Sequence, residues 1–146
     1  MRGTQSEWTL HASGKVFGQL VSEVAEAVDL AALQSRLTEK LAASEFYHKK
    51  RNNGLYFGPD FQGVREVWRK DGEALGWIRL PGIARSADSN FKVHPALLEA
   101  CLQITTSALP SNSDSQALYL PLTWEQARFL APVPHLSLIH ISSPRD

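Results

Sequence analysis

The chain has 146 residues, 43% of them hydrophobic and 21% charged, which is the balance of an ordinary globular domain with one modest core. Its 15 basic and 15 acidic residues give zero formal net charge, so no overall field favours nucleic acid or an anionic membrane. The single cysteine, Cys101, excludes an internal disulfide framework and fits a reducing cytoplasm. No apolar run approaches the roughly 18–20 residues that span a bilayer. We therefore expect a cytoplasmic protein, or a piece of one, with neither a membrane nor a nucleic acid as partner.

The first 43 residues do not form a self-sufficient pattern. Alternating apolar residues over 8–20 predict a strand, and a strand needs neighbours for its backbone groups. Residues 21–43 are rich in Ala, Leu and Glu, and Asp29 can cap a short helix that contains Leu33. We interpret residues 21–43 as a linker with helical content. A single strand followed by a linker indicates that the chain starts inside a larger domain.

Residues 44–132 form a more consistent unit. A helix is predicted from Ser44 to Asn53, and a second from Pro95, at its first turn, to about Ala108. The dipeptide Asp71-Gly72 between two strand-like segments is a strong hairpin signal. Strands are predicted at residues 64–69, 74–80, 117–120 and 124–130. Strands around one well-formed helix predict an α+β domain whose sheet wraps that helix.

The last residues do not continue this pattern. Residues 137–142 read Ser-Leu-Ile-His-Ile-Ser, which resembles a string produced when sequencing-adapter DNA is translated at the end of a read. We interpret residues 133–146 as a non-native tail and leave about the last ten residues out of the fold prediction. The alternative is a genuine edge strand.

The helix from Pro95 carries the candidate chemistry. At 100° per residue one wide apolar stripe is expected, formed by Leu97, Leu98, Cys101, Leu102, Ile104, Thr105 and Ala108. Glu99 and Gln103 are four residues apart and are expected on a common face away from that stripe. The plain interpretation is a solvated face. The other is a ligand site, because the residues bordering the pair are small.

Three motifs, taken together with their order and spacing along the chain, resemble those of the dehydratase domains of modular type I polyketide synthases. Residues 94–103, His-Pro-Ala-Leu-Leu-Glu-Ala-Cys-Leu-Gln, resemble the acid-bearing helix of that family. Residues 54–63, Gly-Leu-Tyr-Phe-Gly-Pro-Asp-Phe-Gln-Gly, resemble its Gly-Tyr-x-Tyr-Gly-Pro-x-Phe motif, and residues 120–124 its Leu-Pro-Phe-x-Trp motif. Residues 8–14 are similar to the strand that ends the first half of the domain. The resemblance covers about residues 7–132.

The resemblance implies a hot-dog fold, an antiparallel sheet wrapped around a central helix, and a double hot dog with the active site between its halves. On that pattern residues 1–20 hold the last strand of the first hot dog and residues 44–132 the second. The implied reaction removes water from a β-hydroxyacyl thioester held by the phosphopantetheine of an acyl carrier protein, without any other cofactor or a metal. Other synthase domains are the remaining implied partners. The implied catalytic residues are Glu99 and Gln103; the implied substrate-binding residues are Tyr56, Phe57, Gly58, Pro59 and Phe61.

The chain departs from the family pattern in three places. The motif His-x-x-x-Gly-x-x-x-x-Pro, which carries the proton-abstracting histidine, is absent, and His11 does not have its spacing. The acid position holds Glu99 in place of Asp, and Phe57 replaces a tyrosine. We therefore expect the chain alone to be incomplete as an enzyme. A non-catalytic dehydratase-like half that only scaffolds the synthase is the second hypothesis, and a free-standing hot-dog thioesterase or hydratase is the third.

A basic run, His-Lys-Lys-Arg at residues 48–51, has two interpretations. It can be a solvated helix end favoured by the helix dipole, or a docking point for an acidic carrier protein. The five histidines show no metal-ligand spacing, and Cys101 is expected in the core.

Overall fold

The computed structural model describes residues 8–15, 29–82, 91, 93–110, 117–123 and 136–142. Its centre is one four-stranded antiparallel sheet in the order β1-β2-β3-β4. The strands are β1 (Glu39–Ala42), β2 (Val64–Lys70), β3 (Glu73–Arg79) and β4 (Leu136–Ser142). The helices are α1 (Leu30–Arg36), α2 (Ala43–Asn52) and α3 (Pro95–Thr105), with short 3-10 turns η1 (Pro59–Phe61) and η3 (Thr106–Ala108).

The hairpin between β2 and β3 forms where the sequence predicts it. Lys70 pairs with Glu73, which leaves Asp71 and Gly72 as a two-residue turn. Gly72 has a φ of 80°, a conformation that favours glycine because a side chain would be strained there. The Gly72 N–H donates to the Ala108 carbonyl at 2.8 Å, so the turn also meets the end of η3.

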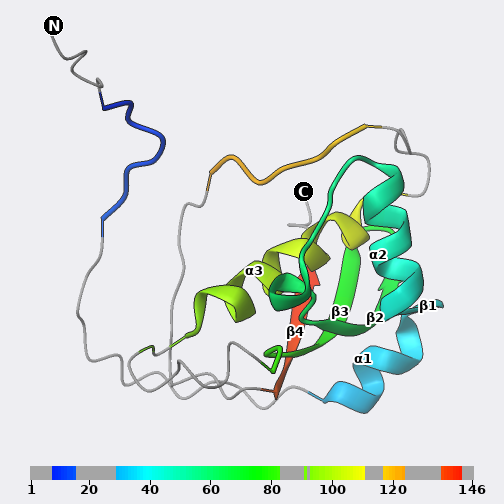
Figure 1. The fold of residues 1–146 in the computed structure, drawn as a ribbon. Helices are drawn as coiled ribbons and strands as arrows, with labels where there is room; N and C mark the ends of the chain where they lie inside the picture. Colours follow the sequence, from blue (N-terminus) through cyan, green and yellow to red (C-terminus); the bar gives the residue numbers. More distant parts are fainter. Residues whose placement is uncertain are drawn as a thin grey trace, which may run out of the picture.

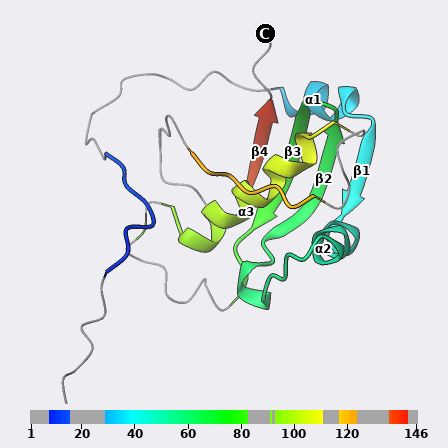
Figure 2. The same cartoon turned by 90° about the horizontal axis from the view of Figure 1, so that it is seen from above.

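Helix α3 crosses one face of the sheet and forms the core with it, as Figure 2 shows from above. The inward residues of β3 are Ala74, Gly76 and Ile78, all fully buried, and α2 contributes Phe46 and Tyr47 to the same core. Helix α1 lies on the opposite face, where Leu33 and Leu37 pack on Leu75 and Trp68. The predicted α+β architecture, a sheet around a central helix, is confirmed (Figure 1).

Helix α3 buries only part of the predicted stripe, namely Leu97 and Ile104. Its buried residues are Ala96, Leu97, Ala100, Gln103 and Ile104. The predicted core residues Leu98, Cys101, Leu102 and Thr105 are only half-buried. The helix turns its small residues to the sheet because two glycines there allow close approach.

Those glycines leave no room for a side chain. A Cβ on Gly63 would lie 2.8 Å from the Ala100 Cβ, and one on Gly76 would lie 2.0 Å from the Ile104 Cδ1. Contacts that short force the neighbours to move. The distance between α3 and the sheet therefore depends on glycine at both positions.

Gly76→Ala should lower the free energy of unfolding by about 1–3 kcal/mol, because the new methyl overlaps Ile104. Ile104→Val in the same chain removes the Cδ1 methyl and should return part of that loss. Urea unfolding followed by circular dichroism measures both. Gly58→Ala is the control, because a Cβ there meets nothing within 4 Å. Equal losses for Gly76→Ala and Gly58→Ala would contradict the close packing.

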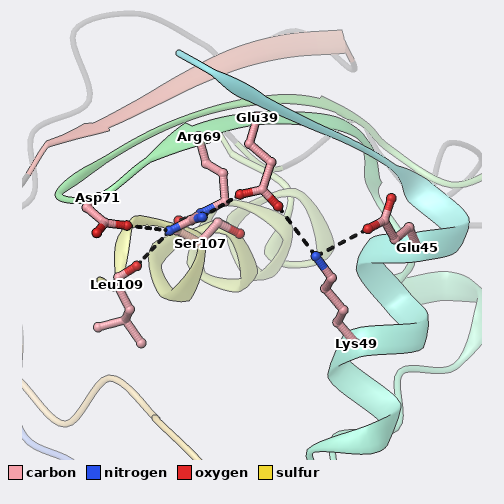
Figure 3. A network of polar contacts seen from close by, with 7 residues as sticks. All are labelled: Glu39, Glu45, Lys49, Arg69, Asp71, Ser107 and Leu109. Atoms are coloured by element: carbon pink, nitrogen blue, oxygen red, sulfur yellow. Dashed lines mark hydrogen bonds and ion pairs between the residues drawn. The ribbon is translucent and has the colours of Figure 1, made fainter. Parts of the chain in front are cut away.

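The end of α3 is fixed by one arginine, drawn in Figure 3. The Arg69 guanidinium donates to the carbonyls of Ser107 at 2.6 Å and Leu109 at 2.8 Å. It also pairs with Glu39 at 2.5 Å and Asp71 at 3.1 Å. The hydrogen bond from Arg69 lowers the pKa of the Glu39 carboxyl. Strand β1, the hairpin and the end of α3 are thus joined through a single side chain.

Two strands form where the sequence did not predict them. The described part of the linker, residues 29–43, contains the predicted helix capped by Asp29 but also β1, which pairs with β2 and adds Leu41 to the core. Residues 136–142 of the predicted tail form edge strand β4, paired with β3 from Glu73 to Arg79. The alternating residues Ile139 and Ile141 pack on the core, which explains why this string can complete the sheet. Its origin from adapter DNA stays a prediction.

The remaining predicted strands are not formed in the described residues. Residues 8–15 and 117–123 have no regular secondary structure, and Trp8 is fully exposed. Neither segment is paired with the described sheet. Residues 16–20 and 124–130, where the predictions continue, lie outside the described residues.

Candidate active site

The site residues predicted from the sequence lie on two neighbouring elements. Helix α3 carries Glu99 and Gln103. The turn before β2 carries the predicted substrate-binding residues, which are Tyr56, Phe57, Gly58, Pro59 and Phe61. Glu99 is half-buried, whereas Gln103 is 4% exposed and faces the core rather than solvent. The expectation that both lie on a face away from the core is therefore wrong for Gln103.

The start of α3 is determined by its first residues. The His94 Nδ1 accepts a hydrogen bond from the Ala96 N–H at 3.1 Å, and Pro95 follows at a position where its missing N–H leaves no bond unmade. The His94 ring packs edge-on against Phe91, with centroids 5.5 Å apart. This cap places Glu99 in the second turn of the helix.

Gln103 joins α3 to both neighbouring elements. Its Oε1 accepts from the Tyr47 hydroxyl at 3.1 Å, and its Nε2 donates to the Phe61 carbonyl at 3.0 Å. The Tyr47 hydroxyl in turn accepts from the Val64 N–H at 2.9 Å. These bonds satisfy buried polar groups that would otherwise destabilise the core. Sequence reasoning missed Tyr47, although its place on one face of α2 with Phe46 was readable.

Tyr47 remains protonated at neutral pH. Burial raises its pKa to about 12, and the nearby Glu99 carboxylate adds to that rise, although the Val64 N–H and Arg65 act in the opposite direction. A protonated hydroxyl has one hydrogen to donate. Tyr47 is thus a permanent donor to Gln103 over the physiological range.

The turn before β2 is held by its own backbone. The Phe61 N–H donates to the Gly58 carbonyl at 2.9 Å, and the Gln62 side chain donates to the Phe57 carbonyl at 2.8 Å. Pro59 begins the 3-10 turn. Tyr56 is 78% exposed and Phe61 46% exposed, so both aromatic rings are open to a ligand or to another protein segment.

A pocket of about 140 Å³ lies beside this turn. It is lined by Tyr47, Arg51, Leu55, Tyr56, Phe57 and Gln62. Two predicted substrate-binding residues, Tyr56 and Phe57, therefore share one hollow. Glu99 does not line it, and the link between the turn and α3 is the bond from Gln103 to Phe61.

The basic run on α2 is divided by the fold. His48, Lys49 and Arg51 are exposed, whereas Lys50 is 8% exposed and donates to the Thr106 hydroxyl. Burial lowers the pKa of Lys50 to about 8. Lys49 pairs with Glu45 and Glu39. The run is thus not a uniform solvated patch, because helical periodicity brings Lys50 to the same side as Phe46 and Tyr47.

The described part of the chain contains neither a metal-binding cluster nor a membrane-spanning helix. No three His, Cys, Asp or Glu side chains gather there in a way that could hold a metal ion. None of the described helices has the length and apolar character required to cross a membrane.

Cys101 is a half-buried free thiol whose pKa burial raises to about 11.

The sheet around α3 places this protein in the class of hot-dog folds, with a polar pair on its central helix. The family model described as "Polyketide synthase dehydratase N-terminal domain" matches residues 25–141. The chain belongs to the polyketide synthase dehydratase family, and the resemblance seen in its motifs is confirmed at that level.

Relatives and solved structures agree with this assignment. The chain is 35% identical over 121 residues to polyketide synthase GfsE of Streptomyces halstedii, covering 81% of this chain and 3% of that protein. It is 36% identical over 100 residues to the pikromycin synthase component PikAII of Streptomyces venezuelae, covering 68% and 3%. The dehydratase domain of the curacin CurF module has a TM-score of 0.75 at 26% identity, covering 81% of this chain and 42% of that one. The chain thus spans a small part of the whole synthases and less than half of a solved dehydratase domain.

Proposed function

We propose that this chain is most of the second hot-dog half of a dehydratase domain in a modular polyketide synthase. The acid-bearing motif at residues 94–103 and the missing histidine motif support the second half, although the matching family model is described as the N-terminal domain. A span of 42% of a solved dehydratase domain is consistent with one half. Residues 8–15, exposed and unpaired with the sheet, would then belong to the first half.

The proposed reaction removes water from a β-hydroxyacyl thioester on an acyl carrier protein. The Glu99 carboxyl donates a proton to the departing β-hydroxyl, which leaves as water. A histidine of the first half takes the α-proton. Both groups are needed, because a weak carbon acid and a poor leaving group must be handled together. In the related curacin CurK dehydratase, 28% identical with a TM-score of 0.68, an aspartate-to-asparagine variant is described as inactive. A histidine-to-phenylalanine variant of that protein is described in the same way.

One observation carries this proposal on the chain itself. Glu99 lies half-buried on the central helix, one turn before a buried amide that is bonded to the predicted substrate-binding turn. Tyr56, Phe57, Gly58, Pro59 and Phe61 would contact the acyl chain. The substrate would arrive on the phosphopantetheine of the carrier protein, and the domain would need no cofactor or metal of its own. The synthase that holds it would work in the cytoplasm.

A non-catalytic half remains the second candidate, because two specific residues favour it. Glu99 stands where the family motif has Asp, and Phe57 removes a tyrosine hydroxyl from the turn. The Phe57 ring packs on Tyr47, with centroids 6.2 Å apart, so it has a structural role in either case. The dehydration rates of Glu99→Gln and Glu99→Asp in the complete domain separate the two candidates.

The isolated chain should not dehydrate a β-hydroxyacyl carrier protein, because the proton-abstracting histidine is absent. Removal of a general base typically lowers the rate by about 10²–10⁴-fold. The complete domain, expressed from the parent gene, should show dehydration when acyl-carrier products are followed by mass spectrometry. Turnover by the 146-residue chain at the rate of the complete domain would show that the base lies within these residues. No turnover by the complete domain would reject the proposed activity.

A further inference from the structure

A polar seam runs between α2 and α3 inside an otherwise apolar core. Its members on one side are Gln103 of α3 and Thr106 of the following turn η3; on α2 they are Tyr47 and Lys50, one turn apart. Glu99 precedes Gln103 by four residues and therefore lies on the same side of α3, one turn nearer its start. The seam thus connects α2 to the side of α3 that carries the proposed acid.

The direction of every hydrogen bond at Gln103 is determined by its partners. The Phe61 carbonyl can only accept, so the amide nitrogen of Gln103 must lie on that side. The Val64 N–H can only donate, so it occupies a lone pair of the Tyr47 hydroxyl and leaves the hydroxyl hydrogen for the Gln103 oxygen. The amide is therefore held in one of its two possible orientations by groups whose roles cannot reverse.

The ring contacts of Tyr47 do not require its hydroxyl. The ring packs against Phe46, with centroids 5.1 Å apart, and against Phe57. Phenylalanine could make those contacts equally well. The hydroxyl is thus present for Val64 and Gln103, and its removal would free the oxygen end of the amide.

We propose that Tyr47 is a positioning residue of the dehydratase site: its hydroxyl holds the Gln103 amide in one orientation, bonded to the substrate-binding turn and one helical turn from Glu99. This inference rests on the proposed function for its catalytic consequence. The ring of Tyr47 also lines the pocket beside Tyr56 and Phe57, whereas the proposed role belongs to its hydroxyl, which acts through Gln103. Beyond these bonds the amide keeps one N–H and one oxygen lone pair. On this proposal they bond the Glu99 carboxyl or a substrate oxygen in the complete domain.

The positioning can be tested on the 146-residue chain without any activity. The Gln103 side-chain NH₂ should give one pair of well-separated NMR signals that exchange slowly with solvent, because its orientation is fixed. In Tyr47→Phe the exchange should become at least about tenfold faster, because the oxygen end has lost its donor. Unchanged exchange in Tyr47→Phe would overturn the proposal. This result holds whether or not the complete domain is an enzyme.

The catalytic consequence is tested in the complete domain by a double-mutant cycle. Tyr47→Phe should lower kcat about tenfold with KM within about twofold, because a slightly misplaced group weakens the transition state more than binding. Gln103→Met should lower kcat at least as much, and adding Tyr47→Phe to it should lower kcat no further. Multiplied losses in the double variant would mean that Tyr47 does not act through Gln103.

Phe46→Leu is the matched control for a loss of stability alone. It removes a buried ring that touches Tyr47 and lies beneath the Lys50 ammonium, but it takes part in none of the hydrogen bonds of the seam. Its melting temperature should fall while its kcat, measured well below that temperature, stays within twofold of the parent. Loss of kcat in Phe46→Leu equal to that in Tyr47→Phe would reduce Tyr47 to a packing residue.

Discussion

Glu99→Gln in the complete dehydratase domain should lower the dehydration rate by about 10²–10⁴-fold, the usual contribution of a positioned acid or base. The amide matches the carboxyl in shape and cannot donate an acidic proton. Glu99 is only half-buried on α3, so this substitution should leave the fold and the melting temperature nearly unchanged. The rate is followed as conversion of a β-hydroxyacyl carrier protein to its unsaturated product.

Glu99→Asp is the informative partner of that variant. The shorter side chain withdraws the carboxyl by roughly one C–C bond, about 1.5 Å, to the reach that the family motif has. A misplacement of about 1 Å can cost on the order of 10²-fold, so Asp should equal or exceed the natural rate. Equal rates for the parent, Gln and Asp would mean that Glu99 carries no chemistry, and the non-catalytic half would then be the better proposal.

Lys50→Met should raise the free energy of unfolding of the chain by about 2–3 kcal/mol at pH 7. Burial lowers the pKa of Lys50 from 10.5 to about 8. Each pKa unit corresponds to about 1.4 kcal/mol by which the folded chain disfavours the charged lysine. The lost bond to Thr106 offsets part of the gain, at roughly 1 kcal/mol. Methionine matches the length of the buried stem and carries no charge.

The pH dependence of stability gives an independent test of Lys50. Below pH 8 Lys50 is charged in both the folded and the unfolded chain, and the folded chain carries the full free-energy cost of burying that charge. As the pH rises above 8, the folded chain releases the proton while the unfolded chain keeps it, so stability should increase with pH. Urea unfolding between pH 7 and 9.5 should show this rise in the parent and lack it in Lys50→Met.

Lys49→Met is the control for that series. Lys49 is the exposed neighbour, with ion pairs to Glu45 at 3.2 Å and to Glu39 at 3.5 Å, and such surface pairs contribute about 0–1 kcal/mol. It should change stability slightly and keep the rise with pH. A Lys50→Met chain less stable than the parent at pH 7 would show that the bond to Thr106 outweighs the burial of charge.

Local features of this protein could be predicted from its residues alone. The cap at Asp29, the Asp71-Gly72 hairpin and the start of α3 at Pro95 each depend on a few neighbouring residues, and all three form as expected. The order of the motifs was enough to indicate the dehydratase family, which the comparisons confirm. These signals are local because a cap, a turn or a motif is complete within about ten residues.

The sequence by itself thus determined the family, the hot-dog class and the helix that carries Glu99. Only the tertiary structure decided which side of that helix is buried, because close approach at Gly63 and Gly76 turns Ala100 and Gln103 inward. It also decided that Lys50 is buried beside Thr106 and that β1 and β4 complete the sheet. Periodicity describes one element at a time, whereas these outcomes depend on residues distant in sequence that meet only when the sheet and the helices pack together.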